Sequence, residues 1–122
     1  MPEATIEAIP GASALTAALS IAGLDTTGFT FLGFLPHKKG RQTALKGIAV
    51  SELPVVLYES PHRILKLLEE LKAVEVSRVI IARELTKIHE EVISGTPDEL
   101  QEHFKKHPDT VRGEFVVIVN GE

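Results

Sequence analysis

The sequence predicts one α/β domain with a mixed five-stranded sheet flanked by about four helices. Segments 54–59, 79–82 and 115–119 are nearly continuous apolar runs of strand length, which is typical of strands covered on both faces. Capped helical patterns alternate with these runs along the chain. With 122 residues, of which 43% are hydrophobic and 25% charged, the chain can bury the core of a single domain.

The first third of the chain predicts an extended segment, a helix and a strand. Residues 5–9 are a short extended lead-in, and the dipeptide Pro10-Gly11 is a strong turn signal. Ser13 can cap a helix whose body, 15–22, is apolar around most of its circumference. The aromatic segment 29–34 is too short for a helix and predicts a strand.

The middle of the chain predicts a basic loop followed by a strand-turn-helix unit. Residues 37–41 are either a solvated loop or a mobile loop that contacts phosphate, and 41–52 are weakly helical. After the strand at 54–59, Ser60 can cap a helix with Pro61 in its first position. The buried stripe of that helix is Ile64, Leu67, Leu68 and Leu71.

The last third predicts strands at 79–82, 91–93 and 113–119. Thr96 and Glu99 have the spacing of a capping box, which predicts a helix that ends near His107.

Composition excludes several classes of protein. The formal charge of −4 argues against a uniformly basic surface for a polyanion, and the lack of Cys excludes disulfides and thiolate sites. No apolar run approaches the roughly 20 residues that span a bilayer, and no secretory signal is present. We therefore expect a cytoplasmic protein with no membrane contact.

Two loops that follow predicted strands, 59–63 and 83–90, are unusually polar, and in open α/β sheets ligands bind at such loops. Each polar residue also has a purely structural interpretation. Arg63 can neutralise Glu59, Arg83 and Glu84 can form an ion pair that fastens the loops, and His62 can be an ordinary surface residue.

Metal and nucleotide motifs are weak. His103 and His107 have a spacing that can bind zinc, but no third ligand is in view and Lys105 and Lys106 disfavour a cation, so we expect no metal. No glycine-rich phosphate loop occurs.

Four motifs together resemble the tetrapyrrole methylase superfamily, and within it the branch that methylates ribosomal RNA. The motifs are IPGASA at 9–14, YESPHRI at 58–64, ARELTKIHEE at 82–91 and GEFV at 113–116. The resemblance covers nearly the whole chain from Ile6, in the order and spacing of the family.

This resemblance implies transfer of a methyl group from S-adenosylmethionine to the 2′-hydroxyl of a cytidine in small-subunit ribosomal RNA. It also implies that 11–122 is the C-terminal domain of a two-domain protein, with 1–10 as a lead-in from an N-terminal domain that carries the cofactor's glycine-rich motif. Partners would be the ribosomal subunit, that N-terminal domain and a second copy in a homodimer. In the isolated chain, the lead-in should be disordered or pair with another copy. This chain holds only half of the cleft, so alone it should not bind the cofactor or catalyse methyl transfer.

The resemblance also implies roles for individual residues. Cofactor contacts would come from Pro10, Ser13, Ala14, Tyr58, Glu59, Ala82, Arg83, Gly113 and Phe115. RNA contacts would come from Arg63, Arg83, Lys87 and His89, and the candidates for proton acceptor are Glu59, His62 and Glu84. Two other functions stay open: methylation of a tetrapyrrole, and a non-enzymatic domain that docks a partner through 29–34 or 6–9.

Overall fold

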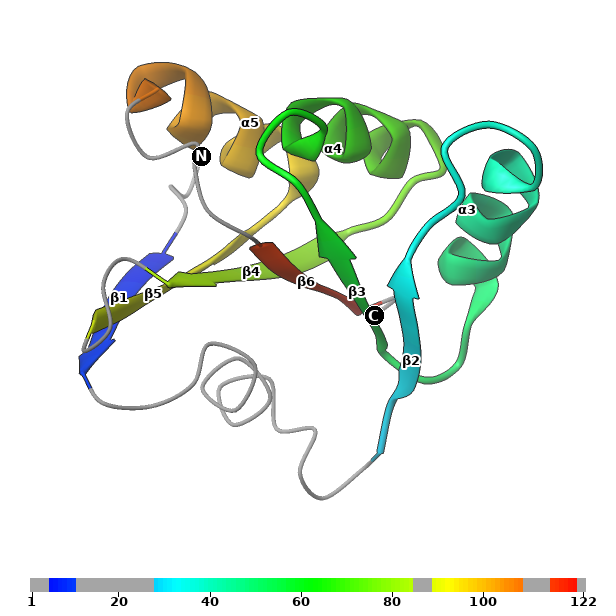
Figure 1. The fold of residues 1–122 in the computed structure, drawn as a ribbon, viewed down its shortest axis with the longest axis horizontal. Helices are drawn as coiled ribbons and strands as arrows, with labels where there is room; N and C mark the ends of the chain where they lie inside the picture. Colours follow the sequence, from blue (N-terminus) through cyan, green and yellow to red (C-terminus); the bar gives the residue numbers. More distant parts are fainter. Residues whose placement is uncertain (1–4, 11–27, 85–88, 109–114, 121–122) are drawn as a thin grey trace.

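The structure is a computed structural model that describes residues 5–10, 28–84, 89–108 and 115–120, with the backbone alone for 5–10, 84, 89 and 90 (Figure 1). The strands are β1 (Thr5–Pro10), β2 (Thr30–Phe34), β3 (Val55–Glu59), β4 (Arg78–Glu84), β5 (His89–Gly95) and β6 (Phe115–Asn120). The helices are α3 (Arg41–Val50), α4 (Ile64–Ala73) and α5 (Pro97–Lys106). None of these described helices has the length and apolar character that crossing a membrane requires.

The six strands form one mixed sheet in the order β1-β5-β4-β6-β3-β2. β2 and β3 are parallel, and every other neighbouring pair is antiparallel. As a result β1, β2, β3 and β4 run one way while β5 and β6 run the other way. The last residues of the first four strands and the first residues of the other two therefore lie along one edge, which we call the carboxyl edge. It consists of Pro10, Phe34, Glu59, Glu84, His89 and Phe115.

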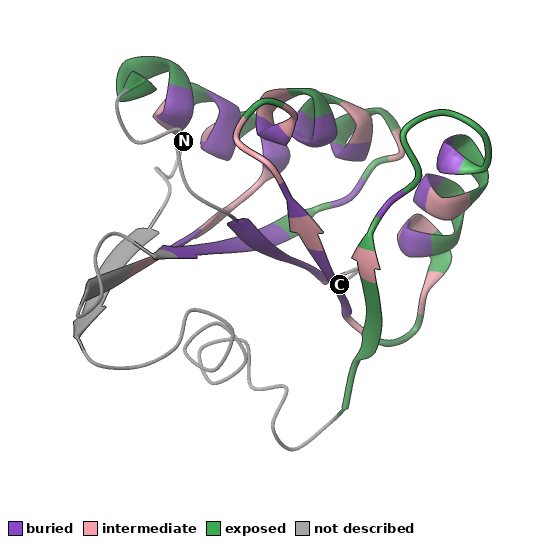
Figure 2. Ribbon diagram, viewed as in Figure 1, coloured by how far each residue is buried: buried purple, intermediate pink, exposed green. Residues whose placement is uncertain are grey.

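The three described helices lie on the same face of the sheet (Figure 1). Their apolar stripes pack on alternate residues of the strands, such as Leu57 of β3, Ile81 of β4 and Val117 of β6. The opposite face of these strands is also buried, as Val56 and Ile118 are fully inaccessible, and Figure 2 shows β3, β4 and β6 largely buried. The continuous apolar runs in the sequence have this cause, because a strand covered on both faces needs no polar alternation.

The α/β class, the mixed sheet and its helical layer are confirmed. The sheet has six strands rather than five, because the lead-in forms β1 and pairs antiparallel with β5 from Thr5↔Ser94 to Pro10↔His89. The expectation that the lead-in is disordered or pairs with another copy was therefore wrong, because the unpaired edge of β5 offers main-chain partners within the same chain. The predicted helix at 15–22 lies outside the described residues.

The start of α4 in the structure differs from the start predicted from the sequence. α4 begins at Ile64 rather than at Pro61, because residues 61–63 form a turn in which the Arg63 N–H donates to the Ser60 carbonyl oxygen at 3.1 Å. Ser60 is therefore not the N-cap of α4. The capping box of α5 is confirmed: the Glu99 N–H donates to Thr96 Oγ1 at 3.1 Å, and the Thr96 N–H donates to Glu99 Oε1 at 2.8 Å.

The turn after α4 contains a backbone conformation that is rare for a side-chain-bearing residue. Glu75 has φ of 65°, which places it in the left-handed region. Its N–H donates to the Lys72 carbonyl oxygen and the Val76 N–H donates to that of Leu71, each at 3.0 Å. These two bonds are those of a Schellman motif, in which glycine is the usual residue.

Candidate active site

The carboxyl edge brings together predicted site residues that are far apart in the sequence. The backbones of Pro10, Glu84 and His89 and the residues Tyr58–Glu59, Ala82–Arg83 and Phe115 all lie at this edge. Direct register pairs join Glu59 with Phe115 and Pro10 with His89. Ser13, Ala14, Lys87 and Gly113 lie outside the described residues.

Alternation along β3 separates two neighbouring site residues. Leu57 packs on the helical face, so Glu59 lies on that face as well, whereas Tyr58 lies on the opposite face. Tyr58 contacts the rings of two residues of β2 there, Phe31 and Phe34. The side chains of Tyr58 and Glu59 therefore serve different faces of the sheet, although the sequence motif lists them side by side.

Glu59 is the buried acid of the carboxyl edge. Its relative exposure is 4%, and its Oε1 atom is buried with no hydrogen-bond partner among the described residues. Burial raises the pKa of the Glu59 carboxyl, and the positive charges of Arg41 and Arg63 only partly oppose that shift. A buried carboxyl with an unused oxygen and a raised pKa has the properties of a functional acid or base.

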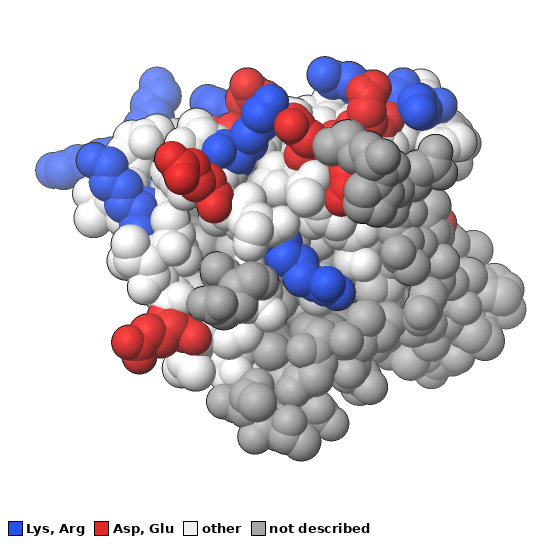
Figure 3. Space-filling view, turned by 180° about the vertical axis from the view of Figure 1, so that it is seen from behind, with Lys and Arg blue, Asp and Glu red and all other residues white. Residues whose placement is uncertain are grey.

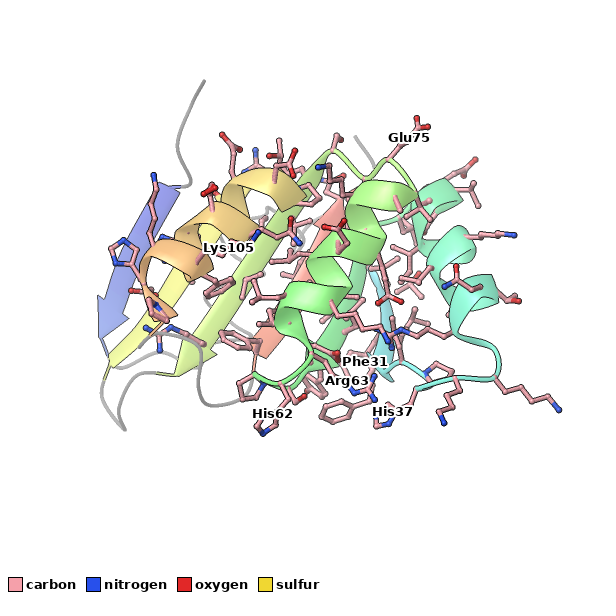
Figure 4. The ribbon with its side chains drawn as sticks, turned by 90° about the horizontal axis from the view of Figure 1, so that it is seen from above. Phe31, His37, His62, Arg63, Glu75 and Lys105 are labelled. Carbon is pink, nitrogen blue, oxygen red and sulfur yellow. The ribbon has the colours of Figure 1, made fainter. Side chains whose placement is uncertain are left out.

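The turn after β3 carries the exposed groups of the site. His62 is exposed and Arg63 is partly exposed, and Figure 4 shows both at the same end of the molecule as Phe31 and His37. Arg63 forms no ion pair with a described residue, so it does not neutralise Glu59 by direct contact. The position of His62 fits both of its interpretations, as a base and as a surface residue.

The end of β4 is organised differently. Arg83 is buried, and its Nε donates to Glu91 Oε1 at 3.1 Å across the β4–β5 ladder. The predicted pairing of Arg83 with Glu84 involves a side chain that lies outside the described ones. The described partner of Arg83 is Glu91, its register partner on β5. The motif RELTKIHEE contains Glu91, so counting residues across a hairpin could have identified this pair.

A second buried arginine, Arg41, ends the basic loop. Its Nε donates to both carboxylate oxygens of Glu70, at 3.1 and 3.0 Å, its Nη2 donates to Oε1 at 2.7 Å, and its Nη1 donates to the Pro36 carbonyl oxygen at 2.9 Å. Arg41 is 4% exposed, whereas the loop residues 37–40 are exposed. The basic segment 37–41 therefore divides into a solvated loop and one structural arginine, which sequence patterns did not separate.

His103 on α5 lies near the Arg83–Glu91 pair. Burial lowers the pKa of His103, as does the nearby His107, and its Nε2 atom is buried with no hydrogen-bond partner among the described residues. The two imidazole rings are 4.9 Å apart. No group of three metal-ligating side chains occurs in the part of the chain that the structure describes.

The side of the described surface that Figure 3 shows has no uniformly basic face. In Figure 3 acidic and basic side chains are interspersed along the helical side. Lys72 and Asp98, for example, form a surface ion pair at 2.8 Å with both side chains about half exposed. Any contact with a polyanion must therefore be local, as the net charge indicates.

Comparison with known sequences identifies the family. The profile described as tetrapyrrole (corrin/porphyrin) methylases matches residues 1–101. The chain belongs to the tetrapyrrole methylase family. Among the members that it resembles are proteins called ribosomal RNA small subunit methyltransferase I. That of Xylella fastidiosa strain 9a5c is 42% identical over 116 residues, that of Escherichia coli O157:H7 is 43% identical over 116 residues, and that of Thermotoga maritima is 37% identical over 118 residues.

The match covers most of this tetrapyrrole methylase chain but only part of each relative. It spans 93% of the chain and 42% of the Xylella protein, 93% and 41% for the Escherichia protein, and 96% and 52% for the Thermotoga protein. The chain thus spans about half the length, or less, of the curated relatives it matches. What those relatives do as whole proteins is therefore a proposal for this chain.

Proposed function

We propose that this chain forms one half of an S-adenosylmethionine-dependent methyltransferase that modifies the 2′-hydroxyl of a cytidine in small-subunit ribosomal RNA. The observation that carries the proposal is that the described parts of four sequence motifs lie along one edge of one sheet. Relatives that this chain resembles are named as methyltransferases of small-subunit ribosomal RNA. The same fold supports methyl transfer to other acceptors, so the assignment of RNA as the substrate depends on the motifs and not on the fold.

The residues of the carboxyl edge fit this cofactor. The described residues to which the family resemblance assigns cofactor contacts, among them Pro10, Tyr58, Ala82 and Phe115, lie at or within two residues of this edge. Glu59 Oε1 has no described hydrogen-bond partner and can accept a hydrogen bond from a ligand hydroxyl or ammonium group. When bound, S-adenosylmethionine would supply an electrophilic methyl group on its sulfonium.

The residues of this chain would then position the RNA and receive its proton. Displacement at the methyl requires the attacking oxygen in line and about 3 Å away, so positioning provides most of the rate enhancement. Glu59, His62 and Glu84 are the candidate proton acceptors, and Glu59 has the raised pKa that suits a base. Arg63, Lys87 and His89 are the candidate RNA contacts, while Arg83 is engaged with Glu91.

The complete enzyme would need more than this chain. Small-molecule sites enclose most of the ligand surface, so we expect an N-terminal domain to close the cleft and the isolated chain to bind S-adenosylmethionine negligibly. Micromolar affinity of the isolated chain in calorimetry would contradict this expectation. We also propose a homodimer, to be tested by sedimentation, and a cytoplasmic location, where ribosomal subunits are found.

The test is methyl transfer from labelled S-adenosylmethionine by the full-length protein, offered unmethylated small ribosomal subunits and a precorrin side by side. Label in a 2′-O-methylcytidine of the RNA would support the proposal. Label in the tetrapyrrole alone would favour the alternative that the family description names, while family and fold would stand. No label in either substrate would favour a binding domain without catalysis.

A further inference from the structure

The edge strand β2 exposes its large apolar side chains, in contrast to the strand beside it. Phe31 and Phe34 are 52% and 57% exposed, and Leu32 is 42% exposed, whereas Val56 and Leu57 of β3 are fully buried. Figure 2 shows β2 as the most exposed strand of those whose burial is described. Proteins normally protect an edge strand with charge or proline, so an exposed aromatic edge indicates a surface that binds something.

A β-bulge arranges these rings on one face. The register pairs Phe31 with Val56 and Phe34 with Tyr58, and it shifts between Phe31 and Gly33. Residues three apart in a regular strand point to opposite faces, but the extra residue at the bulge brings Phe31 and Phe34 to the same face as Tyr58. Gly33 has φ of 68°, a conformation that glycine adopts without strain.

The rings form a connected group. The centroids of Phe31 and Tyr58 are 5.4 Å apart in an edge-to-face arrangement, and those of Phe34 and Tyr58 are 5.5 Å apart. We call Phe31, Phe34 and Tyr58 the aromatic platform. Phe34 is the last residue of β2, so the aromatic platform reaches the carboxyl edge where methyl transfer is proposed, on the face of the sheet opposite to the Glu59 side chain.

Cations that form no ion pair with a described carboxylate lie at the same end of the sheet. Lys38 and Lys39 are exposed in the loop that follows β2, and Arg63 is partly exposed in the turn that follows β3. None of the three forms an ion pair with a described residue, in contrast to Arg41 and Arg83. Figure 4 shows Phe31, His37 and Arg63 gathered at one end of the molecule, with Lys105 away from them.

Exposed aromatic rings at the same end of the sheet as cations that have no described ion-pair partner have the chemistry of single-stranded nucleic acid recognition. Bases stack on the rings and the cations hold the phosphates. We infer that the aromatic platform stacks unpaired bases of the substrate RNA while Lys38, Lys39 and Arg63 bind its phosphates. This inference rests on the proposed function, for which it names the surface that presents the RNA to the carboxyl edge.

The test measures binding of a fluorescein-labelled unstructured 12-nucleotide RNA to the full-length protein by fluorescence anisotropy. An oligonucleotide of the same length with abasic residues provides phosphates without bases. The variants are Phe34→Ala, Phe31→Ala and the ring-retaining Phe34→Tyr. Leu53→Ala is the matched control, because Leu53 is 45% exposed but precedes the opposite end of β3. Thermal unfolding of each variant verifies that it is folded.

We expect Phe34→Ala and Phe31→Ala each to weaken binding of the base-containing RNA about tenfold, with Phe34→Tyr and Leu53→Ala near wild type. The abasic oligonucleotide should bind all of these variants equally. Affinity falls as salt rises, and Lys38→Ala and Lys39→Ala should each make the slope of log affinity against log salt shallower by about 0.7. Lys105→Ala should leave this slope unchanged.

Two results would overturn the inference. One is equal binding of the base-containing RNA by wild type and both alanine variants. The other is a change from dimer to monomer in Phe34→Ala without RNA, which would assign the surface to a second copy. Methyl transfer to RNA by the wild type is measured in a separate experiment, so the proposed function stands even if these binding results overturn the inference. Absence of methyl transfer would reject the proposed function whatever the binding data show.

Discussion

The end of β3 and the end of β4 lie on the same edge of the sheet but hold their charges in different ways. At the end of β4, the buried cation Arg83 has a carboxylate partner, Glu91, on the neighbouring strand. At the end of β3, the buried acid Glu59 keeps an oxygen without a described hydrogen-bond partner, and Arg63 forms no ion pair with a described residue. One strand end pairs its charges within the sheet, and the other has charges without a described partner, which we propose for a ligand. The number of cations in a motif therefore overstates the charge that is available to RNA.

The largest expected effect is on the β4 side of this comparison. Arg83→Ala should lower the free energy of unfolding by about 3 kcal/mol, because it leaves Glu91 largely buried without its partner. Urea unfolding of the purified protein measures this loss. The double variant Arg83→Met with Glu91→Leu should recover most of it, since no buried charge is then left unpaired. A loss of less than 1 kcal/mol from the single variant would remove the distinction between the two strand ends.

The corresponding change on the β3 side should affect binding rather than folding. Arg63→Ala should alter the free energy of unfolding by less than about 1 kcal/mol, because Arg63 has no ion-pair partner among the described residues. It should weaken RNA binding several-fold and reduce the salt slope by about 0.7, as expected for loss of one phosphate contact to a single strand. Anisotropy titrations at several salt concentrations measure both, with Lys105→Ala as the control. An unchanged slope would remove Arg63 from the RNA contacts.

Glu59 offers a smaller, pH-dependent test of the same contrast. Burial raises the pKa of the Glu59 carboxyl above the usual 4.5. Between pH 4.5 and the raised pKa, the folded protein therefore retains a proton that the unfolded chain has released. The stabilisation that Glu59 gives to the folded state is therefore fully present below pH 4.5, and it is lost as the pH rises through the raised pKa. Glu59→Gln should match wild-type stability at pH 4 and exceed it at pH 8 in denaturant unfolding. Parallel stability curves for the two proteins would contradict this prediction.

The smallest effect is expected at the opposite end of α4, where a substitution should change stability but leave RNA affinity at the wild-type value. Glu75→Gly should raise the free energy of unfolding by about 1 kcal/mol, because glycine adopts the left-handed conformation without steric strain. Glu75→Ala retains the strain and should give no such gain. RNA affinity should be unchanged, since Figure 4 places Glu75 far from His62 and Arg63. A change in RNA affinity would show that the two ends of the molecule are coupled.

The fold could be predicted where patterns are local. The capping box at Thr96, the buried stripe of α4 and the continuous apolar strands depend on neighbours in the sequence, and the structure confirms them. Pairings between distant segments could not be predicted in this way. β1 joins β5, and Arg41 finds Glu70 at 29 residues' separation, because the topology of the sheet decides both contacts.

The candidate site was predicted at the level of segments rather than side chains. The described parts of the motifs lie at strand ends along the carboxyl edge, and the use of that edge as a site stays a prediction. They did not reveal that Tyr58 and Glu59 face opposite sides, that Arg83 pairs with Glu91, or that a bulge aligns Phe31 with Phe34. Each of these depends on strand register, which a single sequence specifies only through the pattern of buried faces. The assignments of individual site residues stay predictions.

The hydrogen bond from Arg41 to the Pro36 carbonyl oxygen has a consequence for the entropy cost of binding. Arg41 is buried against Glu70 and closes the basic loop into a ring, and Leu35 is buried just before that ring begins. With both ends fixed, the backbone of the few residues between them can search only a small volume, so little backbone entropy of Lys38 and Lys39 is left to lose when a phosphate binds. Such a preorganised loop favours a strand whose phosphates already have matching spacing, and it discriminates against polyanions that would require the loop to reshape.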